Sequence, residues 1–402
     1  MKEYDYLIVG AGIVGLAVAR ELKMREPKAH ICVLEKEAKA GVHASGHNSG
    51  VLHCGIYYSS DSLKARVCAT GARMMREFVE SQNLPIRRSG KVIIATCEEE
   101  LPILDKLMEN AKNNDVCAEL RAVKGIKEIE PNAEPYRAGI YSPDTAVVDS
   151  ALVTQRLANV MSAQGVDIFY HERVKSINPE CCEVKTENNV YHYSYLFNCA
   201  GAYADTIAKF FGLGKDYALV PFKGLYFKLR SEQAGLVNGN IYPVPDVRMP
   251  FLGVHLTKVV SGDVYVGPTA MPAFGREHYG FLKGMEIRES VLMFKHLADL
   301  YLKNAQSFRN LVHQSTVNYL KTFFVHSARK LVPKLTTGDL ISSNKVGIRP
   351  QLINKAKKCL EMDYVIEEGA NSLHVLNSIS PAFTSAFAFA KVILDRRGGG
   401  NQ

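Results

Sequence analysis

The feature that most constrains the fold is a glycine-rich turn between two apolar runs near the start of the chain. The first run, Tyr6–Val9, ends at residues 10–15, which read G-A-G-I-V-G. A helical pattern follows from Leu16 to Met24, and the second apolar run, His30–Leu34, ends at Glu35. Strand, turn, helix, strand and acid in this order form the fingerprint of dinucleotide-binding folds. The chain is therefore predicted to begin with a Rossmann-like βαβ unit.

Each conspicuous position of this unit has a physical task. Gly10 permits the tight turn, Gly12 lets a diphosphate approach the backbone, and Gly15 lets the helix pack closely on the strand. The helix N-terminus offers free N–H groups and the positive end of its dipole to the phosphates. Glu35 lies 20 residues after Gly15 and can accept hydrogen bonds from ribose hydroxyls, which argues against NADP. The motif alone does not separate FAD from NAD.

Composition and charge exclude several classes of protein. The chain has 402 residues, of which 47% are hydrophobic and 22% charged, so about two to three structural units are expected. The net charge of +8 suits an anionic substrate, an anionic membrane surface or nucleic acid, but no block of five like charges indicates a nucleic-acid tail. No apolar run reaches the roughly 18 residues of a membrane span, and no targeting segment precedes the first strand. We therefore expect a cytoplasmic protein.

The remaining patterns alternate between helical and extended segments. Asp61–Asn83 is predicted to be an amphipathic helix with Ser60 or Asp61 as its N-cap. Residues 217–270 are read as strands with turns, and residues 285–330 as two amphipathic helices. Phe383–Leu394 is predicted to be a final apolar helix. This order indicates mixed α/β and α+β architecture, in which a Rossmann-like domain is interleaved with a substrate domain based on a β-sheet.

A histidine-rich loop follows the second strand and could be read as a metal site or a flexible linker. His43, His47 and His53 are separated by four and six residues in a stretch rich in glycine and serine. No cysteine or carboxylate near them completes a set of ligands, and the nine cysteines form no CxxC pair. We therefore predict no metal site.

Several later segments resemble one family. The glycine-rich turn, the run S-G-H-N-S-G at residues 45–50 and Asn198–Asp205 resemble the D-amino acid oxidase superfamily of FAD enzymes. Further, more specific motifs resemble the L-2-hydroxyglutarate dehydrogenase/oxidase family, and the resemblance extends over nearly the whole chain. These motifs lie at residues 50–58, 62–65, 221–224, 240–246, 251–255, 267–268, 276–277, 347–349 and 373–377. Lys223, Thr269 and Asn377–Pro381 depart from the usual family pattern.

The resemblance implies FAD as the cofactor and a division of the chain between two domains. The FAD-binding domain would comprise residues 1–85, 145–220 and 340–397, and the substrate domain residues 86–144 and 221–339, with 398–402 as a disordered tail. The residues expected to contact FAD are Gly10, Gly12, Ile13, Val14, Gly15, Glu35, Lys36, Ser45, His47, Asn48, Ser49, Gly50, Val174, Ala200, Gly201, Gly347, Asn377, Ser378, Ile379 and Ser380.

The resemblance further implies oxidation of a small dicarboxylic 2-hydroxy acid, L-2-hydroxyglutarate, to 2-oxoglutarate. A neutral imidazole is suited to accept the hydroxyl proton at pH 7. His53 is the predicted base, His255 is the second choice, and His374 is expected to orient neighbours. The predicted substrate contacts are Tyr58, Tyr226, Arg248, Arg276, Arg349 and His374.

Two other readings and the electron acceptor stay open on the sequence. A related flavoenzyme for glycine, sarcosine or glycerol 3-phosphate would share the flavin motifs, and a nucleotide- or RNA-binding protein without redox activity would share only the fold. The acceptor could be a quinone, another acceptor or O2. The run Phe323–Val325, flanked by basic residues, suits either a core helix or an element docked on the inner face of a membrane.

Overall fold

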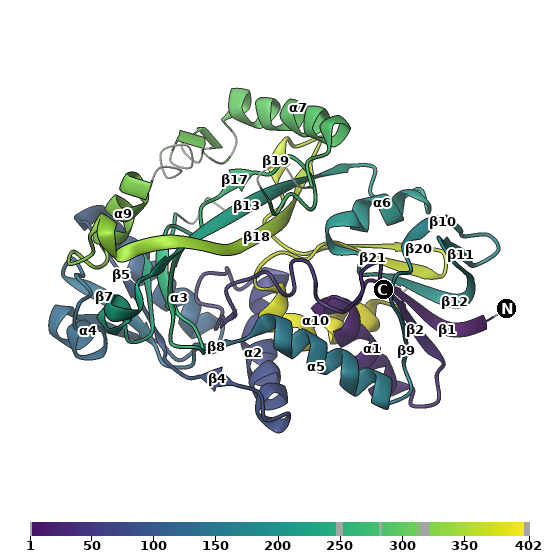
Figure 1. Ribbon diagram of the computed structural model, residues 1–402, viewed down its shortest axis with the longest axis horizontal. Helices are drawn as coiled ribbons and strands as arrows, with labels where there is room; N and C mark the ends of the chain where they lie inside the picture. Colours follow the sequence, from purple (N-terminus) through teal and green to yellow (C-terminus); the bar gives the residue numbers. More distant parts are fainter. Residues whose placement is uncertain are drawn as a thin grey trace.

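The computed structural model describes residues 2–246, 252–280, 284–304, 306, 308–309, 312–313 and 321–397. Figure 1 shows two β-sheets at opposite ends of the molecule, with helices between and around them. The predicted mixed architecture is confirmed. Within the described part of the chain, no helix has both the length and the apolar character needed to cross a bilayer.

The eight-stranded sheet contains the predicted βαβ unit. Parallel pairing gives the order β21 (Ser372–Asn377), β12 (Val190–Asn198), β1 (Lys2–Val9), β2 (Ile31–Leu34) and β9 (Asp167–Phe169). Helix α1, Ile13–Arg25, connects β1 to β2. Antiparallel strands extend the sheet; they are β10 (Val174–Asn178), β11 (Glu183–Thr186) and β20 (Val365–Gly369).

The register of this sheet brings three distant segments to one edge. Val9 lies opposite both Asn198 and Leu34, so β1, β12 and β2 end side by side. Gly10, Ala200 and Glu35 follow these ends in the chain. Ligands of open α/β sheets bind at the carboxyl ends of the strands, which makes this edge the expected cofactor position.

The ten-stranded sheet is mostly antiparallel and is built around two long strands. These are β13 (Tyr217–Leu229) and β18 (Leu340–Asn354), which pair along most of their length. The other strands are β5 (Lys91–Ile94), β6 (Glu119–Ala122), β7 (Ala138–Ser142), β14 (Asn240–Pro243), β15 (His255–Lys258), β16 (Val264–Gly267), β17 (Met271–Pro272) and β19 (Cys359–Leu360). A three-stranded sheet contains β3 (Val51–Leu52), β8 (Ala146–Val148) and β4 (Ile86–Arg87).

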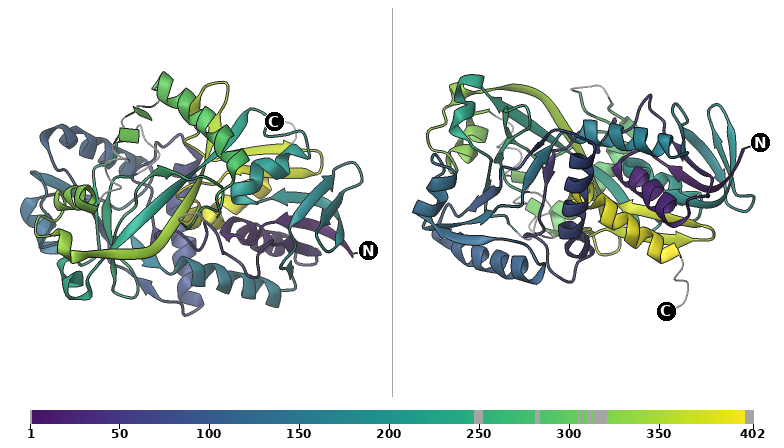
Figure 2. Two further views of the ribbon diagram at one scale, coloured as in Figure 1. Left: turned by 45° about the horizontal axis from the view of Figure 1, so that its top comes forward. Right: turned by 90° about the horizontal axis from the view of Figure 1, so that it is seen from below.

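The helices bury the apolar faces of these sheets. In Figure 2, α10 (Ala382–Arg397) lies beside α1 and α2 (Leu63–Ser81), and it packs against both. The bounds of the other helices are α3 Leu101–Asn113, α4 Val123–Ile129, α5 Ser150–Ala163, α6 Ala204–Lys209, α7 Ile287–Lys303 and α9 Lys321–Arg329.

Most predicted elements are present, with shifted ends. The helix predicted over Asp61–Asn83 begins at Leu63, because Ser62 and not Ser60 or Asp61 accepts the capping hydrogen bond from the backbone of Ala65. The strand β18 belongs to the ten-stranded sheet, although its residues were grouped with the cofactor-binding segments. The domain boundaries themselves stay a prediction, and residues 398–402 lie outside the described residues.

Candidate active site

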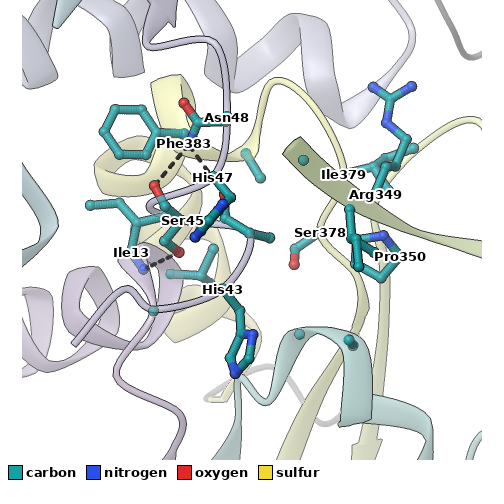
Figure 3. A pocket seen from close by; sticks show the side chains of 18 of the residues that line it. Ile13, His43, Ser45, His47, Asn48, Arg349, Pro350, Ser378, Ile379 and Phe383 are labelled. Atoms are coloured by element: carbon teal, nitrogen blue, oxygen red, sulfur yellow. Dashed lines mark hydrogen bonds between the residues drawn. The ribbon is translucent and has the colours of Figure 1, made fainter. Parts of the chain in front are cut away.

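A cavity of about 400 Å³ lies between the two large sheets and is lined by residues from both of them. One end contains the glycine-rich turn and Glu35, and the other contains His53, His255 and Arg349. In Figure 3, Arg349 lies across the cavity from Ile13 and Ser45. The arrangement brings predicted cofactor and substrate residues to one continuous space.

The glycine-rich turn has the geometry required for an approaching diphosphate. A Cβ atom on Gly10 would lie 2.7 Å from the carbonyl oxygen of Cys199, and Gly10 has a φ of +105°. No acidic residue stands in the first turn of α1, so its positive end is not neutralised there. The side chain of Ser45 accepts a hydrogen bond from the backbone N–H of Ile13 at 2.9 Å. The histidine-rich loop is thus held against the helix N-terminus.

Glu35 is buried at the end of β2, and its carboxylate fixes the backbone around it. One oxygen accepts from the N–H of Ala11 at 2.9 Å, and the other accepts from the N–H of Glu37 at 3.0 Å. Each carboxylate oxygen retains a further lone pair. Glu35 can therefore hold the turn in place and still accept a hydrogen bond from a ribose hydroxyl.

Beside Glu35, a cluster of two carboxylates and one imidazole surrounds the ammonium group of Lys36. Ligand atoms of Glu37, His43 and Glu277 lie within 4.8 Å of one another, a spacing that a metal ion could use. Lys36 Nζ lies 2.7 Å from His43 Nε2 and forms ion pairs with both carboxylates. Burial alone would raise the pKa of Glu37, but the hydrogen bonds from Lys36 and His43 lower it to about 2. The lysine supplies the positive charge that this cluster binds.

The loop that follows Ser45 is built from local hydrogen bonds, as Figure 3 shows for Asn48. The side-chain amide of Asn48 donates to the carbonyl of Ser45 at 2.8 Å and accepts from the N–H of Gly50. His47 Nδ1 lies 2.9 Å from the carbonyl oxygen of Val346 on β18. A Cβ atom at Gly347 would lie 2.6 Å from the carbonyl oxygen of His47, so only glycine fits there. The loop and β18 therefore meet backbone to backbone beside the cavity.

The two predicted proton acceptors are both buried beside the cavity. Burial, and secondarily the positive charge of Lys91, lowers the pKa of His53 to about 3. Burial also lowers the pKa of His255, to about 4, although the Gly253 carbonyl opposes the shift. Both imidazoles are therefore neutral at pH 7, which is the form that can accept a proton.

The two rings differ in how firmly they are held. His255 Nδ1 lies 2.9 Å from the carbonyl oxygen of Gly253, and the ring stacks on Tyr242 with centroids 4.0 Å apart. Nδ1 therefore carries the proton and Nε2 the lone pair. The backbone N–H of His53 donates to Thr384 Oγ1 at 3.1 Å, while its ring atom Nδ1 is buried without a hydrogen-bond partner among the described residues. His53 has a fixed backbone and a ring that no group in the described part of the chain orients through Nδ1.

Arg349 is the buried cation at the substrate end of the cavity. It pairs with Phe222 in the β13–β18 register and lines the cavity with Tyr226. Burial lowers its pKa, while Tyr58 and Tyr226 act in the opposite direction. Tyr58 is absent from the cavity lining, but Arg349 and Ser380 both act on the pKa of its phenol, which burial raises. These groups suit recognition of a carboxylate.

Arg276 lines the cavity, but its guanidinium is bound to protein carboxylates. It forms ion pairs with Asp205 and Glu289 and donates to the carbonyl of Ala202. The guanidinium also lies over the ring of Tyr203, with its carbon 5.3 Å from the ring centroid. Burial would lower the pKa of Arg276, and its two carboxylate partners raise it instead. The predicted substrate contact is not supported, because the guanidinium already has partners on the cofactor side.

Four other predicted site residues do not line the cavity. His374 is fully buried, with Nδ1 3.0 Å from the Asn198 amide and Nε2 3.0 Å from Ser372 Oγ, so both ring nitrogens have protein partners away from the cavity. The side-chain amide of Asn377, at the end of β21, donates a hydrogen bond to the carbonyl oxygen of Asp363 at 2.6 Å. Gly15 and Gly50 permit close backbone packing, since a Cβ atom on either would lie 2.1 Å from a carbonyl oxygen. Arg248 lies outside the described residues.

The remaining predicted cofactor residues are all in the cavity lining: Gly10, Gly12, Ile13, Val14, Glu35, Lys36, Ser45, His47, Asn48, Ser49, Val174, Ala200, Gly201, Gly347, Ser378, Ile379 and Ser380. Sequence reasoning did not select Tyr242, Tyr279, Phe383 or Thr384, which also line it. Tyr242 stands in the motif at residues 240–246 and could have been found there. No sequence signal singled out Tyr279, whose ring lies 4.7 Å from that of His47.

The cavity fits a dinucleotide that carries a flat ring system. It combines a diphosphate cradle at Gly10 and Gly12, a ribose acceptor at Glu35 and a backbone contact at Gly347 that no side chain could enter. Its far end has the neutral imidazoles and the buried guanidinium. These donor and acceptor groups match those expected for FAD and a substrate that carries a carboxylate.

Residues 5–396 match the family described as DAO, FAD dependent oxidoreductase. The chain is 37% identical to "L-2-hydroxyglutarate dehydrogenase, mitochondrial" of Nematostella vectensis, over 98% of this chain and 90% of that protein. It is 35% identical to the Homo sapiens protein of that name, over 98% and 88%, and 34% identical to the L-2-hydroxyglutarate dehydrogenase of Indibacter alkaliphilus, over 98% of each.

Two solved structures share the fold at low sequence identity. They are L-alpha-glycerophosphate oxidase from Mycoplasma pneumoniae with FAD bound (TM-score 0.76, 21% identity, 98% of this chain and 94% of that chain) and glycine oxidase from Geobacillus kaustophilus (TM-score 0.73, 17% identity, 100% and 96%). With the family match spanning nearly the whole sequence, the chain belongs to the DAO family of FAD dependent oxidoreductases.

Proposed function

We propose that this protein oxidises L-2-hydroxyglutarate to 2-oxoglutarate with FAD as its cofactor. The names of its relatives support this substrate, and they match over nearly the full length of the chain. The observation that carries the proposal is the group at the far end of the cavity. There, His53 and His255 are neutral beside the buried cation Arg349, which suits a hydroxyl group next to a carboxylate.

Binding is assigned to groups on the paired strands β13 and β18. Arg349 receives a substrate carboxylate with the planar geometry that favours two parallel hydrogen bonds. Tyr226 lines the same region, and burial raises the pKa of its phenol to about 12, so it stays a hydrogen-bond donor at neutral pH. Lys223 is held at 2.6 Å from the carbonyl oxygen of Gly280 and adds positive charge nearby. This charge distribution favours a dianion over a neutral amino acid.

The hydroxyl proton is assigned to His53. Its backbone is anchored to Thr384, and no described group holds its Nδ1, so the ring can turn toward the hydroxyl and take its single proton. His255 is fixed by Gly253 and Tyr242, so its rigid ring positions the substrate by contact. When bound, FAD supplies the two-electron acceptor for the hydrogen on the α-carbon.

The residues proposed to hold FAD are those of the cavity lining at and beyond the glycine-rich turn. Gly10, Gly12 and the N–H groups at the start of α1 face the diphosphate, and Glu35 faces the ribose. Ser378–Ser380 precede α10, whose N-terminal end lies at the cavity. The positive end of that helix would stabilise negative charge on the flavin ring.

The electron acceptor is proposed to be a membrane quinone, reached by docking on an anionic membrane surface. Helix α9, for which the sequence allows a core helix or a membrane-docked element, does not offer its apolar side, because Phe324 and Val325 are buried in the core of the ten-stranded sheet. Helix α7, at the upper edge of Figure 1, offers another apolar face. Its exposed large hydrophobic residues are Ile287, Val291, Leu292, Phe294 and Leu302.

This face has the character of an interfacial helix. Ile287, Val291 and Phe294 recur at helical spacing, and exposed Lys295 and Lys303 flank the stripe. The holoenzyme should float with anionic vesicles at low salt, and Val291→Glu/Phe294→Glu should abolish flotation while leaving turnover with a soluble dye unchanged. A wild-type protein that stays with the soluble fraction would refute the membrane-docking proposal.

The substrate proposal is tested by product analysis. With a soluble dye as acceptor, the holoenzyme should convert L-2-hydroxyglutarate to 2-oxoglutarate, identified by mass spectrometry, and should leave the D-isomer intact. Glycine and glycerol 3-phosphate serve as controls, because the structural neighbours named above carry those substrates in their names. Turnover of glycine or glycerol 3-phosphate without turnover of L-2-hydroxyglutarate would refute the proposal.

A further inference from the structure

A second cavity, of about 320 Å³, lies on the other side of the loop that carries His53. Its walls come from helix α2, the C-terminal end of α3 and the turn before β8. Cys54 belongs to its lining, while the neighbouring residue His53 belongs to the lining of the active-site cavity. The two cavities are therefore lined by adjacent residues of the same loop.

Three arginines from one helix line this second cavity. Arg66 and Arg73 are seven residues apart, which is close to two turns of helix, and Arg76 follows one turn later on the same side. Arg73 and Arg76 are three residues apart, a spacing at which like charges weakly destabilise a helix. Arg66 and Arg73 are exposed and Arg76 is half-buried, so an anion in the cavity can reach all three guanidinium groups from solvent.

The protein supplies little of that counter-charge within the described residues. Neither Arg66 nor Arg73 has a side-chain hydrogen bond or an ion pair there, and Arg76 donates only to the backbone carbonyl of Asp144. Two aspartates, Asp115 and Asp144, also line the cavity, but no ion pair within 4.0 Å joins either of them to the three arginines. Three positive and two negative side chains leave the lining with a positive excess.

Neutral hydrogen-bond donors complete the lining. They are the hydroxyl of Thr70 and the amide of Asn113. Guanidinium groups combined with amide and hydroxyl donors are the groups that bind phosphate and carboxylate oxygens. Asn114 also lines the cavity, but both N–H groups of its amide donate to the carbonyls of Gly55 and Tyr58, at 3.0 and 2.9 Å, so it connects the cavity to the loop after His53.

We propose that the cavity lined by Arg66, Arg73 and Arg76 is a binding site for a small dianion, distinct from the substrate position. The shared chemistry is a compact group with two negative charges, supplied either by inorganic phosphate or by a free dicarboxylate. Its occupant would contact the back of the His53 loop through Cys54 and Asn114.

Calorimetric titration of the holoenzyme in chloride buffer tests this site without turnover, so its result does not depend on the proposed oxidation. Inorganic phosphate is one titrant and 2-oxoglutarate is the other. The variant Arg66→Gln/Arg73→Gln removes two of the three arginines. The matched control, Arg88→Gln/Arg121→Gln, removes two arginines outside the cavity, of which Arg88 is exposed and pairs with Glu80.

The expected result is saturable binding to the wild type and to the control, weakened at least tenfold in the cavity variant. Binding of phosphate identifies phosphate as the occupant. One equivalent of 2-oxoglutarate more on the wild type than on the cavity variant identifies a dicarboxylate, whether or not the active-site cavity binds 2-oxoglutarate as well. Absence of both, or binding that is equal in the wild type and the cavity variant, overturns the proposal. If the double variant does not retain flavin, Arg73→Gln alone is titrated with the same two criteria.

Discussion

His53 and His255 share an environment that keeps both imidazoles neutral, but only His255 has its tautomer fixed by a carbonyl. A ring with a fixed tautomer is suited to positioning the substrate by contact, and a ring without one can turn to take the hydroxyl proton. This difference separates two roles that a sequence motif assigns equally to either residue.

Alanine variants of the two histidines distinguish these roles. His53→Ala should slow flavin reduction by about 10²–10⁴-fold with flavin still bound, because general-base catalysis is lost. His255→Ala should raise the substrate Kd and slow reduction less, since orientation is impaired but a base is still present. Stopped-flow measurement of flavin absorbance gives both quantities. If His255→Ala is the slower variant, the base role belongs to His255.

The acid limb of the pH profile reports the same groups. The base must be neutral, so the rate is lost only as pH falls through its depressed pKa, about 3 for His53 or about 4 for His255. Reduction should therefore persist down to about pH 5, below the pKa of about 6.5 of an ordinary histidine. A limb at pH 6–7 in the wild type would contradict this account.

Lys91 gives a test of the cause of that depression. Its ammonium, 4.5 Å from the centroid of the Tyr57 ring, lowers the pKa of both histidines, after burial. Lys91→Met should thus move the acid limb toward neutral pH, whereas Lys228→Met, at an ion pair with Asp263 elsewhere in the sheet, should not move it. An unshifted limb in Lys91→Met would exclude the charge as a cause.

At the scale of single residues, the sequence predicted best where a motif imposes geometry. The glycines of the first turn and Glu35 are placed as predicted, because turn, helix and strand leave few alternatives for them. Arg276 and His374 were included among the substrate contacts through the family motifs at residues 276–277 and 373–377. Their protein partners, Asp205 and Asn198, are 71 and 176 residues away in the chain, and no local pattern reveals such pairs.

At the scale of elements, the segment between β17 and α7 connects the two halves of the molecule. Arg276 pairs with Asp205, Glu277 pairs with Lys36, and the ring of Tyr279 lies beside that of His47. Lys223 of β13 reaches the Gly280 carbonyl of the same segment. Arg276, Glu277 and Tyr279 also line the cavity, so the described residues of this segment place charged and aromatic groups against the βαβ unit and the histidine-rich loop.

Removing Arg276 should destabilise this contact. Arg276→Met leaves Asp205, which is 2% exposed, without its two-pronged partner and with only the longer ion pair to Lys209, at 3.6 Å, among the described residues. Removing one partner of a buried pair typically costs about 3–5 kcal/mol, and the pair with Lys209 should reduce that cost. Thermal unfolding of the holoenzyme should show the loss, and Arg276→Met/Asp205→Asn should recover part of it. The substrate KM of the double variant should stay near that of the wild type. A tenfold rise in KM in a stable double variant would return Arg276 to the substrate.

A helix was predicted with good bounds where its apolar stripe is continuous, as in α2, which was expected over Asp61–Asn83 and spans Leu63–Ser81. The stripe of α9 predicted amphipathic character correctly but left open whether a core or a membrane covers it. Phe324 is buried, and its ring lies 5.0 Å from that of Phe227, so the protein core covers this residue. Periodicity gives the apolar face of a helix, and only the tertiary structure gives its partner.

At the scale of the whole molecule, one chain passes between two sheets several times. The strands that carry the site, β1, β13 and β18, begin at residues 2, 217 and 340. The sequence predicted an interleaved arrangement from alternating α and β character, but it could not pair β13 with β18. That pairing depends on the fit of buried side chains far apart in the chain. It brings Arg349 to the cavity and Gly347 against the histidine-rich loop.

The central claim is that this cavity transfers a hydride from L-2-hydroxyglutarate to bound FAD. Anaerobic titration of the holoenzyme, followed by flavin absorbance, tests it without any electron acceptor. One equivalent of L-2-hydroxyglutarate should bleach one equivalent of flavin and yield one of 2-oxoglutarate, while the D-isomer, glycine and glycerol 3-phosphate leave the flavin oxidised. Bleaching by glycine or glycerol 3-phosphate, with L-2-hydroxyglutarate inert, would contradict the account.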